Sequence, residues 1–114
     1  MSKDESLLIV ADSEHDADML YAVRMFLPDP FIFLRVRCQC LIVLSDLELN
    51  RARRVARHCQ VLSLSEYQAR VKKSGVKRPT LAHVVNAVLR DHKLKRVQVP
   101  ESFPHGLARQ LRDL

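Results

Sequence analysis

The sequence is poor in glycine and in aromatic residues, and it has no tryptophan. Its 114 residues include two glycines, Gly75 and Gly106, and aromatic residues make up 5% of the chain. Two isolated glycines cannot form the glycine-rich loop that cradles phosphate groups in nucleotide-binding motifs. The chain also has no low-complexity run, which argues against a fibrous or disordered protein. The remaining reading is an ordinary globular domain with 47% hydrophobic residues.

Signals for membrane insertion and secretion are missing as well. No apolar run approaches the ~20 residues of a membrane-spanning helix. The opening MSKDES is too polar for a secretion signal. The three cysteines, an odd number, are Cys38, Cys40 and Cys59. Free thiols in a reducing compartment are expected from this pattern, so we predict a cytoplasmic protein of one domain, residues 1–114.

Catalytic motifs are also absent. The sequence contains neither HExxH nor GxSxG. A four-ligand zinc site is conceivable from the three cysteines and His58, but the spacing differs from a CxxC knuckle, and His58 and Cys59 are adjacent. Buried or half-exposed thiols are the better explanation of these cysteines. We therefore assign this chain no catalytic residue, no metal ligand and no cofactor.

Charge is distributed unevenly along the chain. The formal net charge is +6, but the seven acids of residues 1–34 outnumber the two bases there, and the bases dominate afterwards. The most basic stretch carries Arg51, Arg53, Arg54 and Arg57 on one predicted helix. Clustered arginines can bind phosphates, and they can equally bind an acidic protein surface. A stand-alone basic module is the alternative hypothesis, although the scarcity of aromatic residues makes nucleic acid a less suitable partner.

Hydropathy patterns predict an alternation of strands and helices. Continuous apolar runs indicate strands, and apolar residues at helical spacing indicate amphipathic helices. The predicted order is strand 7–11, helix 13–27, strands 31–36 and 41–44 joined as a hairpin, helix 45–57, strand 60–63, helices 65–74 and 80–92, strand 96–99 and helix 104–114. This order predicts an α/β domain with a mixed, mostly parallel sheet of about five strands, one antiparallel hairpin, and helices packed on the sheet.

Local signals place the helix ends. Ser45 and Ser65 each precede an acid or amide at the third following position, which predicts two capping boxes. The helix that Ser45 opens is expected to carry Ala52, Val55 and Ala56 on its inward face. Pro79 and Thr80 are expected to start the clearest amphipathic helix, and Gly75 to end the preceding one in the left-handed conformation.

Four stretches give the chain a likeness to a known family. Asp16-Ala17-Asp18-Met19-Leu20-Tyr21-Ala22-Val23-Arg24, Pro28-Asp29-Pro30-Phe31, Leu41-Ile42-Val43-Leu44-Ser45-Asp46 and Val97-Gln98-Val99-Pro100-Glu101-Ser102-Phe103-Pro104 carry it. With the order of elements, they make the chain resemble the N-terminal domain of Xaa-Pro aminopeptidases and prolidases, the creatinase/prolidase N-terminal domain. The chain departs from it where Tyr21-Ala22-Val23-Arg24 replaces the family's Tyr-Leu-Thr-Gly.

The resemblance implies a creatinase N-terminal, ribonuclease H-like topology and a role beside an enzyme. Family members join this domain to a C-terminal pita-bread domain that holds two divalent metal ions (Mn, Zn or Co) and hydrolyses the bond before proline. We therefore expect residues 1–114 to be a fragment lacking that catalytic domain, with the domain as its partner and a homodimer as the assembly. Asp29 and Phe31 are the residues we expect at an interface.

Overall fold

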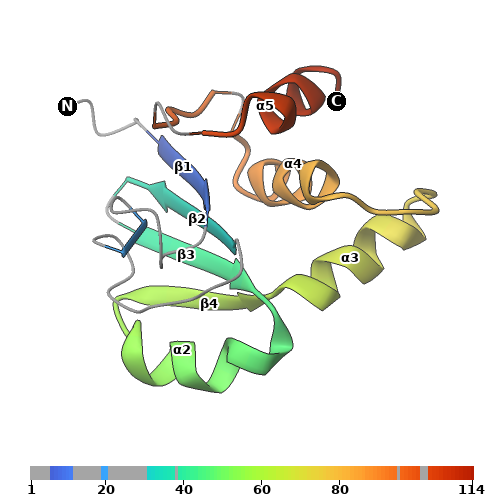
Figure 1. Ribbon diagram of the computed structural model, residues 1–114. Coiled ribbons are helices and arrows are strands. Elements are labelled where there is room, and N and C mark those ends of the chain that lie inside the picture. Colours follow the sequence, from blue (N-terminus) through green and yellow to red (C-terminus); the bar gives the residue numbers. More distant parts are fainter. Residues whose placement is uncertain (1–5, 12–18, 21–30, 38, 95, 101–102) are drawn as a thin grey trace.

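The apolar runs of the sequence form one four-stranded sheet in the computed structural model, which describes residues 6–11, 19–20, 31–37, 39–94, 96–100 and 103–114. Figure 1 shows the sheet with helices on both of its sides. The strands are β1 (Ser6–Ala11), β2 (Phe31–Val36), β3 (Gln39–Leu44) and β4 (Cys59–Ser63), in the spatial order β1-β2-β3-β4.

The pairing of the strands corrects one prediction. β1 pairs with β2 antiparallel, β2 with β3 antiparallel, and β3 with β4 parallel, so the sheet is mixed but mostly antiparallel. The end of β1 lies opposite the start of β2, with Ala11 beside Phe31. A parallel pair of strands needs a long connection between them, but a long connection can equally join two antiparallel strands. The length of the connection therefore does not determine the direction of pairing.

The predicted fifth strand is reduced to a single bridge. Leu7 pairs with Gln98 in a parallel bridge. The Leu8 amide donates to the Gln98 carbonyl at 2.8 Å, and the Gln98 amide donates to the Ser6 carbonyl at 2.7 Å. Pro100 follows two residues later and has no amide hydrogen for continuing the ladder. Residues 96–100 therefore cover part of the β1 edge without forming a strand.

Helices account for most of the rest of the described chain. The predicted helix over residues 13–27 lies almost wholly outside the described residues. None of the described helices is both long and apolar enough to cross a bilayer. The named helices are the 3₁₀ helix η1 (Asp46–Glu48), α2 (Leu49–Val55), α3 (Leu64–Lys73), α4 (Leu81–Asp91) and α5 (His105–Arg112).

The alternation of side chains along the strands gives the sheet two apolar faces. One face packs against α3, α4 and α5, and its fully buried members include Leu34 in the sheet and Val85 and Val88 in α4. The other face packs against α2 through Ala52 and Ala56. Because both faces are covered by helices from the same chain, residues 1–114 bury a core of their own.

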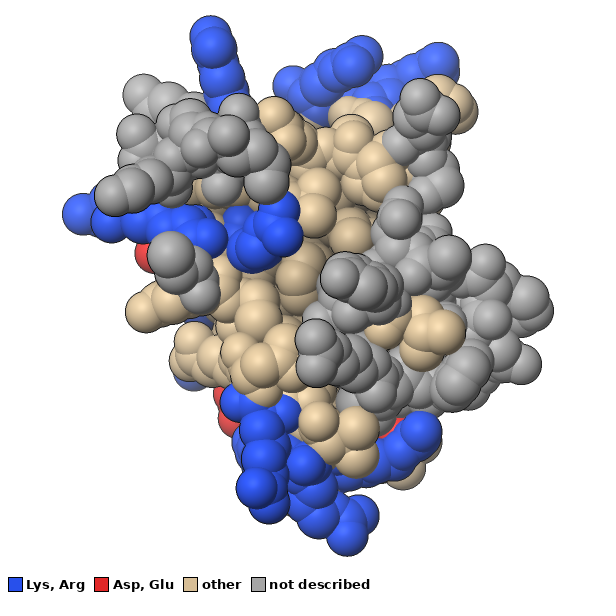
Figure 2. Space-filling model, turned by 90° about the vertical axis from the view of Figure 1, so that its left-hand side faces the viewer, with Lys and Arg blue, Asp and Glu red and all other residues tan. Residues whose placement is uncertain are grey.

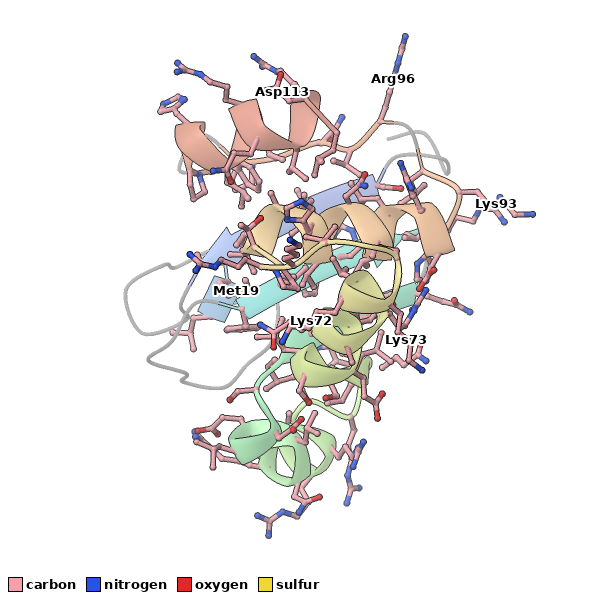
Figure 3. The ribbon with its side chains drawn as sticks, turned by 90° about the vertical axis from the view of Figure 1, so that its right-hand side faces the viewer. Met19, Lys72, Lys73, Lys93, Arg96 and Asp113 are labelled. Carbon is pink, nitrogen blue, oxygen red and sulfur yellow. The ribbon has the colours of Figure 1, made fainter. Side chains whose placement is uncertain are left out.

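The helix ends follow the sequence signals in part. Gly75 has φ 111° after α3, as its predicted left-handed position requires. Thr80 caps α4 in a capping box with His83, whose backbone amide donates to Thr80 Oγ1 at 3.4 Å. Figure 3 shows Lys72 and Lys73 at the last turn of α3, where cations suit the helix dipole.

Two predicted caps and one predicted core residue are wrong. Ser45 makes no capping hydrogen bond, because the chain enters a 3₁₀ turn there instead of an α-helix. α3 is capped two residues earlier than predicted, by Ser63, whose hydroxyl accepts from the Glu66 amide at 3.3 Å. Val55, expected to point inward, is 49% exposed because Ala52 and Ala56 already form the stripe that faces the sheet.

Candidate functional site

Two cysteines and a histidine meet at one end of the β3–β4 pair. Cys40 and Cys59 are directly paired in the parallel register of β3 and β4, so their side chains lie on the same face of the sheet. Their Sγ atoms are 2.8 Å apart. The ligand atoms of Cys40, His58 and Cys59 all lie within 4.8 Å of one another. We call these three residues the Cys-His cluster.

The Cys-His cluster spans the boundary between core and solvent. Cys59 is buried, Cys40 is partly buried and His58 is exposed. The Cys40 thiol donates to the His58 carbonyl oxygen at 3.1 Å. Burial of Cys59, together with the hydrogen bond and the charge of Cys40, raises the pKa of the Cys59 thiol. Burial therefore favours the neutral thiol form of Cys59.

A second polar cluster joins η1 to the start of α3. The Ser63 hydroxyl donates to Asp46 Oδ1 at 2.7 Å, and the Ser65 hydroxyl donates to Asp46 Oδ2 at 2.8 Å. These two hydrogen bonds lower the pKa of the Asp46 carboxyl, with Ser63 as the larger cause. Because Ser63 also caps α3, this arrangement fixes how the two helices flanking β4 begin. Its role is structural.

The arginines singled out by the sequence share one surface. Arg51, Arg53, Arg54 and Arg57 are all exposed on or just after α2. Figure 2 shows Lys and Arg side chains gathered at the lower end of the molecule, where α2 lies. Arg51 forms an ion pair with Glu48 at 3.2 Å. Beside these arginines, Leu47 is 95% exposed and Val55 is 49% exposed, so the surface is both basic and apolar.

The described residues offer this surface no exposed aromatic ring on which a nucleic-acid base could stack. The aromatic side chains among the described residues are all buried, with exposed fractions of 3% for Phe31, 3% for Phe33, 7% for Tyr67 and 6% for Phe103. Proteins that bind single strands stack bases on exposed aromatic rings. The described arginines can therefore contact phosphates, but no described ring is placed to stack on a base.

The two residues predicted at an interface are not brought to one described surface. Asp29 lies outside the described residues. Phe31 is 3% exposed and packs in the sheet face that contacts α2. The interface at this turn stays a prediction.

The described residues do not fit a dinuclear peptidase metal centre. Such a centre needs several carboxylates gathered around two ions. Among the described residues, the Cys-His cluster is the single group of three or more His, Cys, Asp or Glu side chains close enough to share an ion, and it contains no carboxylate.

The sequence indicated the residues of the Cys-His cluster but not which of them lie together. The spacing Cys38-Gln39-Cys40 suggested two thiols on one strand, and His58-Cys59 suggested a second contribution. The pairing of Cys40 with Cys59 depends on the parallel register of β3 and β4, which the sequence pattern does not specify. Cys38 lies outside the described residues.

Comparison with known proteins identifies the fold. No family model and no curated protein matches the sequence. Solved structures do match. An X-Pro aminopeptidase from Thermotoga maritima is similar over 96% of this chain and 28% of its own, at 16% identity and TM-score 0.70. A Xaa-Pro dipeptidase from Bacillus anthracis has 6% identity and TM-score 0.67, and a prolidase from Pyrococcus furiosus has 8% identity and TM-score 0.61.

These matches confirm the likeness to part of the Xaa-Pro peptidases that the sequence resemblance indicated. Each covers 96% of this chain but only 26% to 28% of the matched enzyme, as an N-terminal domain of such an enzyme would. The chain thus has the fold of one part of these peptidases and spans about a quarter of their length.

Proposed function

We propose that this chain is a non-catalytic N-terminal accessory domain of a metal-dependent Xaa-Pro peptidase. The observation that carries the proposal is the match of nearly the whole chain to about a quarter of enzymes described as Xaa-Pro peptidases. A domain of this size with its own two-sided core can pack beside a catalytic domain as a rigid body.

The peptidase chemistry is assigned to a partner domain. The described residues include no carboxylate cluster for metal ions. A C-terminal pita-bread domain with two divalent ions, Mn, Zn or Co, would supply the activated water for hydrolysis before proline. This chain would contribute shape and support to that domain, and its fold alone does not prescribe the substrate.

We assign docking of that domain to the surface of η1 and α2. Leu47 is almost fully exposed, and Val55 adds a second exposed apolar side chain. The surrounding arginines favour an acidic rim on the partner. The occupant we commit to is the catalytic domain, because the matched enzymes are about three and a half times as long as this chain.

Two further parts of the proposal concern assembly and compartment. Homodimer formation, with Asp29 and Phe31 at or near the interface, remains a prediction from the sequence resemblance. The free thiols Cys40 and Cys59 suit a reducing compartment, which supports a cytoplasmic location.

The docking proposal is tested by one substitution made in two contexts. Leu47→Asp should lower the melting temperature of the gene's full product, because the side chain is covered there, and should leave that of isolated residues 1–114 unchanged. Val99→Asp is the matched control, since Val99 is also an exposed apolar side chain, at 44%. Equal effects of Leu47→Asp in both contexts would contradict docking at this surface.

A further inference from the structure

We propose that Cys40, His58 and Cys59 form a binding site for one zinc ion. The inference is independent of the accessory-domain proposal, since it rests only on residues of this chain. The observation behind it is that two thiol sulfurs and an imidazole share one small volume at the end of the β3–β4 pair. Thiolate sulfur and imidazole nitrogen are the donors that zinc prefers in proteins.

The distances suit a tetrahedral zinc ion after a small adjustment. With zinc–sulfur bonds of about 2.3 Å and zinc–nitrogen bonds of about 2.0 Å, tetrahedral ligand atoms lie about 3.5 to 3.8 Å apart. The three ligand atoms here lie within 4.8 Å of one another. The two sulfurs are 2.8 Å apart and must therefore separate by about 1 Å to bind the ion. A rotation of the partly buried Cys40 side chain can provide that movement.

The charges balance when zinc binds. A hydrogen bond joins the sulfurs of the Cys40 and Cys59 thiols. Zinc binding forms two Zn–S bonds and one Zn–N bond and releases the two thiol protons to solvent. The two thiolates then neutralise the ion, so no net charge is placed beside the apolar side chains around Cys59.

The strand backbone holds two of the three ligands, Cys40 and Cys59, in fixed positions. Cys40 and Cys59 are held by the ladder between β3 and β4, and the Cys59 amide donates to the Ala56 carbonyl at 3.0 Å. His58 lies in the short turn between α2 and β4, and its side chain is exposed. The ion would therefore tie the end of α2 to the sheet and keep one coordination position open to solvent for a water molecule.

A third donor distinguishes this site from a simple disulfide. A Cys40–Cys59 disulfide would use the two sulfurs alone. The imidazole of His58 within reach of both sulfurs has a use in a metal site and none in a disulfide. The geometry therefore favours zinc over oxidation.

Cobalt is a suitable probe, because Co²⁺ in a tetrahedral thiolate site absorbs strongly in the visible range, whereas Zn²⁺ is silent. Residues 1–114, reduced with a phosphine and kept free of oxygen, are titrated with Co²⁺ and then with Zn²⁺. We expect saturation at one Co²⁺ per chain, bleaching by one equivalent of Zn²⁺, and a melting temperature that rises with zinc concentration.

Single substitutions assign the ligands. Cys40→Ser and Cys59→Ser should each abolish the thiolate absorption, and His58→Ala should weaken binding about a hundredfold. Cys38→Ser is the matched control and should bind cobalt as the unaltered chain does. Far-ultraviolet circular dichroism of each metal-free variant separates loss of a ligand from loss of the fold.

The outcomes decide the proposal. Stoichiometric cobalt binding that depends on Cys40, His58 and Cys59 supports it. Absence of a saturable visible spectrum in the folded, reduced chain overturns it, as does formation of a Cys40–Cys59 disulfide that zinc does not prevent. A loss in Cys38→Ser as large as that in Cys40→Ser would overturn the three-ligand assignment.

Discussion

Arg70 of α3 and Asp91 of α4 form a two-pronged ion pair that joins the two helices. Arg70 Nη1 donates to Asp91 Oδ2 and Arg70 Nη2 to Asp91 Oδ1, each at 2.8 Å. The Tyr67 hydroxyl donates to the same Asp91 Oδ2 at 2.9 Å, and the Arg70 guanidinium lies 4.9 Å from the centre of the Tyr67 ring. The pair therefore belongs to a three-residue network on the surface of the main core.

This network predicts that the free energy of unfolding falls at low pH. The Arg70 hydrogen bonds are the largest cause that lowers the pKa of the Asp91 carboxyl below its usual 3.8. A lowered folded-state pKa contributes stability that is complete above the unfolded-state value and is lost as pH falls through the folded-state value. Asp91→Asn should therefore reduce the loss of unfolding free energy below about pH 4, measured by urea denaturation between pH 2 and pH 6.

The coupling free energy between Arg70 and Asp91 is expected to be modest. Arg70 is 56% exposed and Asp91 33% exposed at the side chain, so solvent screens the pair. A double-mutant cycle with Arg70→Ala and Asp91→Ala should give a coupling of about 1 kcal/mol at pH 7. A coupling indistinguishable from zero would show that the network does not fasten α3 to α4.

The Asp46 cluster predicts a perturbed carboxyl that NMR can follow. The carboxyl pKa of Asp46 should lie below 3.8 in the folded protein, because the Ser63 and Ser65 hydroxyls stabilise its charged form. Ser63→Ala should raise that pKa more than Ser65→Ala does. A pH titration of the side-chain carboxyl carbon measures both shifts, and an Asp46 value that neither substitution changes would contradict the geometry.

The capping box at α4 predicts a loss of stability on a single substitution. Thr80→Ala removes the side-chain acceptor of the His83 amide and should lower the free energy of unfolding by about 1 kcal/mol. Lys77→Ala, an exposed change just before the cap, is the control and should stay within about 0.5 kcal/mol of the unaltered chain. Equal values for the two variants in urea denaturation would argue against the cap.

A buried hydroxyl predicts a gain of stability. Ser6 is 4% exposed, and its Oγ atom has no hydrogen-bond partner in the described structure. Replacing an unsatisfied polar group by an apolar one removes the cost of desolvating it. Ser6→Ala should therefore leave the unfolding free energy unchanged or raise it by up to about 1 kcal/mol, whereas a loss of more than about 1 kcal/mol would reveal a partner for the hydroxyl.

The sequence predicted the elements better than their pairing. Phe31–Val36 was predicted as a strand with its observed bounds, and the predicted helix at residues 80–92 is observed as Leu81–Asp91, because continuous apolar runs and helical spacing are local signals. The prediction of a mostly parallel sheet was wrong, because β1 runs antiparallel to β2 and strand direction is not a local signal. The pairing of Cys40 with Cys59 could not be predicted for the same reason, because it arises from the register between two strands.

The most direct test of the accessory-domain account is to isolate the native product of the gene, measure its mass, and assay it on Xaa-Pro peptides beside residues 1–114 alone. The account predicts a polypeptide roughly three and a half times as long as this chain, with hydrolysis that depends on divalent metal ions, and no hydrolysis by residues 1–114 alone. A native product that ends at Leu114 and neither binds a peptidase domain nor cleaves such peptides would contradict it, as would metal-dependent cleavage by the isolated chain.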